Sequence, residues 1–177
     1  MSTSLVSELE RLADALESDG TVSAEMSLAV IAEKIAKELR VKADEVAILA
    51  VSQRWRHLHF LVPHVLKNVG FIPLTSNSAL AARTARDSRP EINNNFSAVR
   101  HATVFEGVKA GTTTGESIQK IISAPMLFEG KVVGVIQISR KGGSLVSAGP
   151  DFTPEQLGRV LAICKPLGKL VSRLAGE

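Results

Sequence analysis

Residues 123–138 read SAPMLFEGKVVGVIQI, and this stretch decides the fold of the 177-residue chain. Two largely apolar arms, Lys120 to Phe128 and Lys131 to Ser139, flank the dipeptide Glu129-Gly130. A two-residue connection containing glycine is typical of a tight β-hairpin. Side chains alternate along a strand, so the second arm has one face of Gly134, Ile136 and Ile138 and another of Val133, Val135, Gln137 and Ser139.

The composition is that of an ordinary globular domain. Hydrophobic residues make up 45% of the chain and charged residues 22%. A chain of this length suits one domain and can bury roughly two thirds of its unfolded surface. Cys164 is the only cysteine, which excludes an internal disulfide. The net charge of +3, from 21 basic and 18 acidic residues, predicts no nucleic-acid partner.

The chain carries no sign of a membrane protein. Its apolar runs are far shorter than the ~20 residues that a membrane span requires. The first residues, Met1 to Leu5, lack the basic and then apolar pattern of a signal peptide. We therefore expect a cytoplasmic protein without a membrane partner.

Helical and strand patterns alternate before the hairpin. We expect a helix at 24–39, a buried strand at 46–51, a strand at 57–66, an extended piece at 71–74 and a helix at 78–86. Pro63 cannot donate to a sheet, so the second of these strands ends there or lies at an edge. A polar, glycine-containing stretch at 109–116 is typical of an exposed mobile loop.

The last helix has a strongly marked start. Thr153 is an N-cap, Pro154 occupies the first turn, and Gln156 completes a capping box. Phe152 and Leu157 stand where a hydrophobic staple would place them.

The first segment carries a leucine stripe, with Leu5, Leu9, Leu12 and Leu16 at steps of four, three and four. Such spacing puts the leucines on one face of a helix. Two interpretations are open: the helix packs on its own domain, or it forms a seam with a second copy. The C-terminal helix is also apolar on more than one side, which favours a homodimer joined through the terminal helices.

The order of these elements resembles that of the GAF domain, a small-molecule sensor module of signalling proteins. The resemblance covers about Ala24 to Leu174. It rests on Ile72-Pro73-Leu74 with residues 79–86 and Arg89-Pro90, on residues 123–138, and on residues 151–157. The expected fold class is α/β (α+β), with a GAF-like central antiparallel sheet, flanking helices and an N-terminal helix. A PAS-type sensor, which shares this plan, is the alternative.

The resemblance implies a ligand between the sheet and a covering segment from Ala79 to Glu116. The candidate ligand-binding residues are Asn93, Asn95, Phe96, His101, Phe105 and Gln137. Residues 1–20 would then be a dimerisation and signalling helix, and residues 21–177 a regulatory sensor domain that transmits the state of an unidentified small molecule through its terminal helices. The alternatives are a ligand-free dimerisation or scaffold module and a small-molecule enzyme.

Known ligand classes of GAF domains leave marks that this sequence lacks. The covering segment has no cysteine to attach a bilin. The residue pattern of cyclic-GMP-binding members and the cysteine set of methionine-sulfoxide-reducing members are also missing. Cys164 is expected to be a buried packing thiol. The sequence therefore names no cofactor.

Other polar residues of the chain are candidates for metal binding or catalysis. His57 and His59 lie on one strand face, about 6.8 Å apart, but no acidic residue or cysteine at metal-like spacing joins them. Arg83, Arg86 and Arg89 form either a solvated face or one that steers an anionic ligand. No Ser-His-Asp, paired-carboxylate or phosphate-loop pattern is present. We therefore expect no catalytic or metal site and no enzyme.

Overall fold

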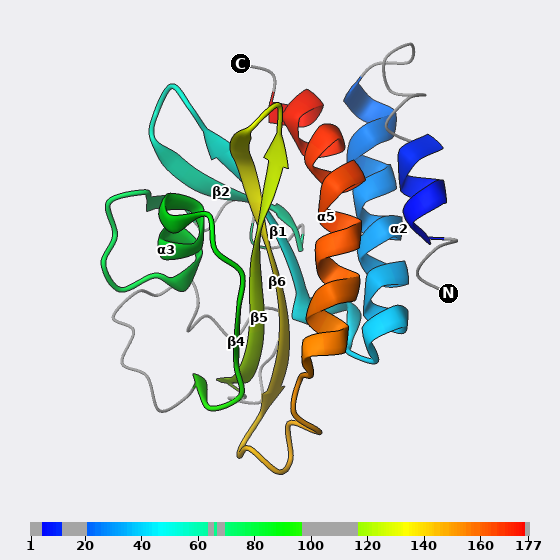
Figure 1. Ribbon diagram of the computed structural model, residues 1–177, viewed down its shortest axis with the longest axis vertical. Coiled ribbons are helices and arrows are strands. Elements are labelled where there is room, and N and C mark those ends of the chain that lie inside the picture. The colour runs from blue at the N-terminus through cyan, green and yellow to red at the C-terminus, as the bar shows by residue number, and fades with distance from the viewer. Residues whose placement is uncertain (1–4, 12–20, 64–65, 67–69, 97–116, 176–177) are drawn as a thin grey trace.

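A computed structural model of the chain describes residues 5–11, 21–63, 66, 70–96 and 117–175. Within these residues one sheet of six strands runs in the order β3-β2-β1-β6-β5-β4 (Figure 1). Every neighbouring pair of strands is antiparallel. The predicted fold class, α/β with a central antiparallel sheet and flanking helices, is confirmed.

The predicted hairpin is the longest pair of strands. β5 (Ser117–Phe128) and β6 (Lys131–Gly142) are paired from Phe128 opposite Lys131 to Ser117 opposite Gly142. The turn residues Glu129 and Gly130 both have positive φ, 52° and 78°, as a type I′ turn requires. Both strands extend beyond the predicted arms at their open end.

The other strands add to both sides of the hairpin. β1 (Val46–Ser52) is the buried strand that was predicted, and it pairs with β6 and with β2 (His57–Val62). β2 ends just before Pro63, and β3 (Phe71–Pro73) forms the edge beyond it. β4 (Glu91–Asn93) pairs with β5 at the opposite edge. The sequence pattern did not predict β4, because it is only three residues long.

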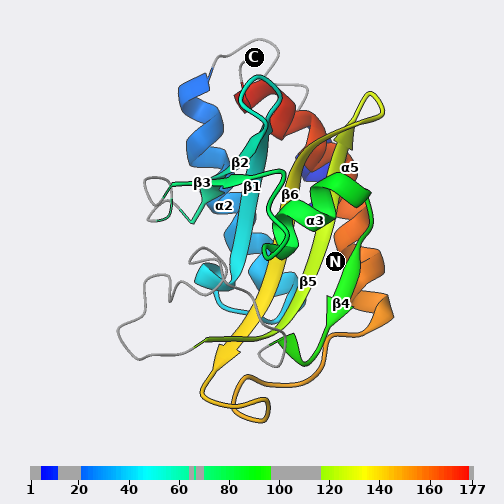
Figure 2. The same cartoon turned by 90° about the vertical axis from the view of Figure 1, so that its left-hand side faces the viewer.

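Helices cover the two faces of the sheet unequally. α2 (Thr21–Leu39), α5 (Pro154–Ala175) and the helical residues 5–11 lie on one face (Figure 1). The short α3 (Leu80–Asp87) lies on the other face, which is turned toward the viewer in Figure 2. A 3-10 turn, η1 (Ala43–Glu45), leads from α2 into β1. None of the helices in the described parts of the chain is both long and apolar enough to cross a bilayer.

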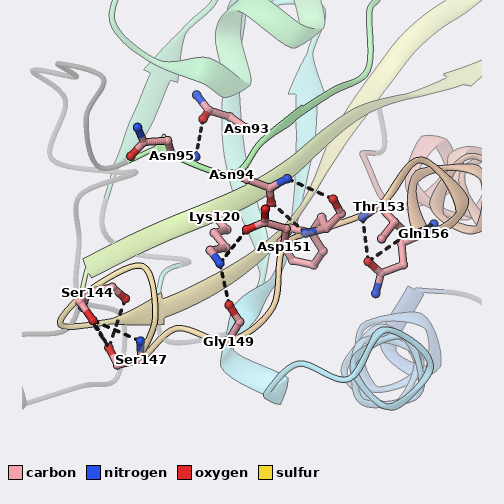
Figure 3. Close-up of polar contacts among 11 residues, drawn as sticks. Asn93, Asn94, Asn95, Lys120, Ser144, Ser147, Gly149, Asp151, Thr153 and Gln156 are labelled. Carbon is pink, nitrogen blue, oxygen red and sulfur yellow. Dashed lines mark hydrogen bonds and ion pairs between the residues drawn. The ribbon is translucent and has the colours of Figure 1, made fainter.

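The start of α5 is capped as the sequence predicted (Figure 3). The backbone N–H of Gln156 donates to Thr153 Oγ1 at 3.2 Å. In return, the Thr153 N–H donates to Gln156 Oε1 at 2.9 Å. Phe152 and Leu157 both pack in the core beside the cap, in agreement with the predicted staple.

The first leucines of the N-terminal stripe are buried within their own chain. Leu5 and Leu9 belong to the core that α2, α5 and the sheet share. Leu12 and Leu16 lie outside the described residues. For Leu5 and Leu9, the interpretation that the helix packs on its own domain is the correct one, so these two side chains give no support to a homodimer.

The main core lies between the sheet and the helix pair. It contains Ile48 and Ala50 of β1, Ile136 and Ile138 of β6, and the inner face of α5. Gly134 faces this core, because a Cβ there would meet the Leu49 carbonyl oxygen and lie 2.7 Å from Met126 Cε. The missing side chain thus makes room for neighbouring protein atoms, one of the two uses, a close neighbour or a ligand, that a glycine within a strand allows.

Candidate functional site

Polar side chains are buried on the face of the sheet that carries α3. Along β6, Ile136 and Ile138 join the helix-side core, so Gln137 and Ser139 point to the α3 side. Both are buried, at 5% and 4% exposure, and Ser123 on the neighbouring β5 is fully buried. Burying a polar group costs free energy unless it is hydrogen-bonded, so its partners matter.

Three of these groups form one hydrogen-bonded cluster. Thr84 Oγ1 lies 2.7 Å from Ser123 Oγ and donates to the Leu80 carbonyl oxygen at 2.9 Å. Because a hydroxyl has one proton, Ser123 then donates to Thr84 and accepts the bond from Gln137 Nε2 at 3.2 Å. Thr84, Ser123 and Gln137 are called the polar cluster below. It ties α3 to β5 and β6.

Further polar bonds continue toward the open end of the hairpin. Ser139 Oγ donates to the Glu45 carbonyl oxygen at 3.3 Å. The buried Glu45 carboxylate accepts bonds from the backbone N–H groups of Lys42, at 2.8 Å, and Lys141, at 2.6 Å. Gln119 Nε2 donates to the Gly142 carbonyl oxygen at 2.9 Å. This half of the sheet is therefore lined by hydrogen-bonded polar groups.

The predicted ligand-binding residues lie in different environments. Gln137 is part of the polar cluster, and Phe96 is buried against Leu80 and Ile121. Asn93 is half-buried, and its Oδ1 accepts a bond from the exposed Asn95's N–H at 2.8 Å, which closes a local turn. The two remaining candidates, His101 and Phe105, lie outside the described residues, as does the loop predicted at 109–116. The ligand role of all six residues stays a prediction.

Sequence reasoning missed Thr84 and Ser123. Ser123 stands between Ile122 and Ala124, in a segment of β5 that is otherwise buried and apolar. A lone hydroxyl in such a run is a signal, since a buried hydroxyl needs a partner. Its partner Thr84 lies 39 positions away, which a local pattern does not reveal.

The middle asparagine of the predicted trio has a structural role (Figure 3). Asn94 Nδ2 donates to the Phe152 carbonyl oxygen at 3.1 Å, and the Phe152 N–H donates to Asn94 Oδ1 at 2.8 Å. Nearby, Lys120 Nζ donates to the Gly149 carbonyl oxygen at 2.6 Å and pairs with Asp151 at 2.8 Å. These bonds fix the loop before α5 to β4 and β5.

The two histidines of β2 lie on one face, as predicted, in a hollow of about 640 Å³. His57 stacks on Phe71 with ring centroids 4.1 Å apart. The ring centroids of His57 and His59 are 6.1 Å apart. Across the described ranges, no three His, Cys, Asp or Glu residues are grouped so that they could hold a metal ion. The hollow is bordered by aromatic rings, including Trp55.

Cys164 is a buried thiol in the helix-side core, as expected. Burial raises the pKa of Cys164 to about 12. Its thiol is therefore protonated and unreactive at neutral pH, because the thiolate is the nucleophilic form.

Comparison with solved structures places the chain in a known fold. The GAF domain of an Acinetobacter phosphoenolpyruvate-protein phosphotransferase aligns with 97% of this chain and 95% of its own, at 17% identity and a TM-score of 0.65. Residues 122 to 287 of a methyl-accepting chemotaxis protein align over 96% of both chains, at 13% identity and a TM-score of 0.67. No family model and no curated protein matches the sequence.

The chain has a GAF-like fold, and the resemblance inferred from the sequence is confirmed at that level. Identities below one fifth establish the architecture, and function has to be argued from the site.

The expectation that the chain is no enzyme is corrected by the same comparison. A type II free methionine-R-sulfoxide reductase from Thermoplasma acidophilum aligns with 87% of this chain over 95% of its own length, at 16% identity and a TM-score of 0.60. Reductases of the same name from two other organisms match as well. The fold therefore carries enzymes, and the absence of a familiar catalytic motif was no basis for excluding catalysis.

Proposed function

We propose that this chain is a regulatory small-molecule-binding sensor domain whose ligand occupies the α3 side of the sheet. The observation that carries the proposal is the polar cluster, which lies buried on that face. A sheet packed for stability alone would be apolar there, since each buried hydroxyl or amide contributes little net stability. Similar structures come from a chemotaxis protein and a phosphotransferase GAF domain, which supports a sensor role.

The chemistry of the site favours a neutral, hydrogen-bonding ligand. Thr84, Ser123 and Gln137 are all uncharged, and they combine donors with acceptors. Phe96 and Ile121 add apolar contact area beside them. The proposed contacts are those predicted from the sequence: Asn93, Asn95, Phe96, His101, Phe105 and Gln137.

Signal transmission is proposed to run through the bonds between Asn94 and Phe152. Asn93 and Glu91 point to the α3 side of β4, since Ile92 packs against the helix-side core. Asn94 follows directly and holds the backbone of Phe152, two residues before α5 begins. A ligand that shifts the end of β4 would thus move the first turn of α5.

A homodimer through the terminal helices is part of the proposal. Its support now comes from Val30 on α2 and Leu161 on α5, which are 51% and 40% exposed. The double variant Val30→Glu/Leu161→Glu should shift a dimer to monomer in light scattering with the fold intact. Val146→Glu is the matched control, because Val146 is 90% exposed in the loop before α5. A monomeric unmodified chain at tens of micromolar would overturn this part.

A variant series tests the ligand site itself. Protein purified from cells is measured by native and by denaturing mass spectrometry, and the difference is the mass of a non-covalent ligand. Ser123→Ala and Gln137→Leu should each reduce the bound fraction. Ser172→Ala is the matched control, because Ser172 lies on α5, away from the α3 face, and its Oγ donates to the Lys169 carbonyl oxygen at 2.7 Å. Equal loss in the control would contradict the assignment to the α3 face.

The matches to reductases favour one second candidate, a small-molecule enzyme that uses the same face. Incubation with free methionine-R-sulfoxide and a dithiol reductant, followed by amino-acid analysis, distinguishes the two. Formation of methionine at a rate above the reductant alone would favour the enzyme. A bound ligand without turnover would favour the sensor.

A further inference from the structure

A second hollow, of about 380 Å³, lies at the turn end of the hairpin. Its polar lining is Gln53, Arg56, Arg86 and Lys131, and its apolar lining includes Leu74 and Val132. These six residues define the basic hollow. The volume suits a small molecule.

The fold brings the three cations together from distant parts of the chain. Arg56 is in the turn between β1 and β2, Arg86 in the last turn of α3, and Lys131 at the first position of β6. The spacing in the sequence instead groups Arg86 with Arg83 and Arg89. Arg83 is engaged elsewhere, because its guanidinium pairs with Glu91 at 2.9 Å.

Hydrogen bonds hold two of these residues in place. Arg86 Nη1 donates to the carbonyl oxygens of Leu74, at 2.6 Å, and Ser76, at 2.5 Å, which pins the guanidinium at the rim. The Arg56 N–H donates to the Ser52 carbonyl oxygen at 2.9 Å, and the Arg56 carbonyl oxygen accepts the Leu74 N–H at 3.1 Å. The backbone at Arg56, with φ of 56°, is thus fixed beside Arg86.

Among the described residues, no acidic group balances the charge of the basic hollow. None of these residues contributes a carboxylate to the lining, and none of them forms an ion pair with any of the three cations. The acidic residues nearest along the chain, Asp87 and Glu129, are not part of the lining. Three like charges around one concavity repel one another and attract a counter-charge.

The basic hollow is distinct from the polar cluster. Thr84 and Arg86 are two positions apart on α3, which places them on opposite sides of the helix. Thr84 bonds Ser123 under the helix, whereas Arg86 reaches the β3 side. A ligand in one site therefore does not occupy the other.

We propose that the basic hollow binds a small organic phosphate. A guanidinium suits phosphate oxygens because it presents several N–H groups in one plane. Three positive charges match a dianion better than a carboxylate monoanion. Gln53 lies beside them, and its Nε2 donates one bond to the Val132 carbonyl oxygen at 3.2 Å, which leaves its second N–H for a ligand. Leu74 and Val132 provide the surface for the apolar part of the ligand.

The test is a titration of the full chain with phenyl phosphate, followed by backbone amide chemical shifts. Saturable shifts at Gln53, Arg56 and Lys131 are expected, with weaker binding as salt rises. Arg56→Gln and Lys131→Gln should each weaken binding about tenfold, the lower end of the effect of one hydrogen bond to a charged group. The double variant should abolish saturation at millimolar probe. Arg159→Gln/Lys165→Gln is the matched control, since it removes two cations from α5 and should leave binding unchanged.

Three comparison probes sharpen the result. Benzyl alcohol should cause no saturable shifts, and benzoate and inorganic phosphate should both bind more weakly than phenyl phosphate. Equal binding of benzoate or of inorganic phosphate would overturn the assignment to an organic phosphate. Equal loss in the α5 control, or no saturable shift with phenyl phosphate at low salt, would overturn the site.

Discussion

The two faces of the sheet are built differently. On the helix side, Ile48, Ile122 and Ile136 of three neighbouring strands meet α2 and α5 in one continuous apolar core. On the α3 side, the same strands place Ser123 and Gln137 among apolar neighbours. Along β6, Ile136 and Ile138 pack on the helix side, whereas Val135, Gln137 and Ser139 face the α3 side. The difference teaches that the helix side holds the larger apolar core, whereas the α3 side combines a smaller apolar core with the polar cluster.

The largest expected effect is on the helix side. Ile136 is fully buried at the centre of the sheet, so Ile136→Ala leaves a cavity. We expect a loss of about 3 kcal/mol in the free energy of unfolding, measured by urea denaturation with circular dichroism. A loss below about 1 kcal/mol would contradict the view that the core on this face contributes strongly to stability.

The next largest effect on stability is expected where Asn94, after β4, holds the backbone of Phe152, before α5. Asn94→Ala removes both bonds to the Phe152 backbone, which should cost about 1–2 kcal/mol. Amide exchange should become faster in the first turn of α5. Asn95→Ala is the control. Asn95 is exposed, and within the described residues its side chain forms no bond to Phe152. Equal acceleration in both variants would remove the special role of Asn94.

The buried thiol of the helix side predicts a pH dependence. Burial raises the pKa of Cys164 to about 12, whereas a thiol in the unfolded chain has a pKa of about 8.5. The unfolded state therefore loses its proton first, so this thiol makes the folded chain less stable as pH rises between these two values. Between pH 9 and 10 we expect a loss of about 1 kcal/mol that Cys164→Ala does not show. Parallel pH profiles of the two proteins would contradict this.

The smallest effect on stability is expected for the polar cluster. The triple variant Thr84→Val/Ser123→Ala/Gln137→Leu replaces all three members of the polar cluster at once, so no bond between these members is left half-made. Its free energy of unfolding without ligand should lie within about 1 kcal/mol of the original. Urea denaturation of ligand-free protein measures this. A loss as large as that of Ile136→Ala would show that the cluster holds the fold together.

The parts of the fold that could be predicted depend on local patterns. The hairpin follows from alternating side chains around Glu129-Gly130, and the start of α5 from Thr153 and Gln156, which lie three positions apart. β4 was missed because its three residues gain their structure only from pairing with β5.

The candidate site was predicted less completely for the same reason. Gln137 was predicted because it lies on the strand that contains Gly134, opposite the covering segment, but its partners Ser123 and Thr84 come from other elements. The basic hollow joins residues as far apart as Arg56 and Lys131. Contacts of this kind depend on the register of strands and the placement of α3, which a single sequence pattern does not contain.

The most direct test of the sensor proposal is the mass of the native protein purified from cells, compared with its denatured mass. The proposal predicts an additional non-covalent mass on the original chain and on Ser172→Ala, and its loss from the triple variant of the polar cluster. A native mass equal to the denatured mass under gentle conditions, or a bound mass that the triple variant retains in full, would contradict it.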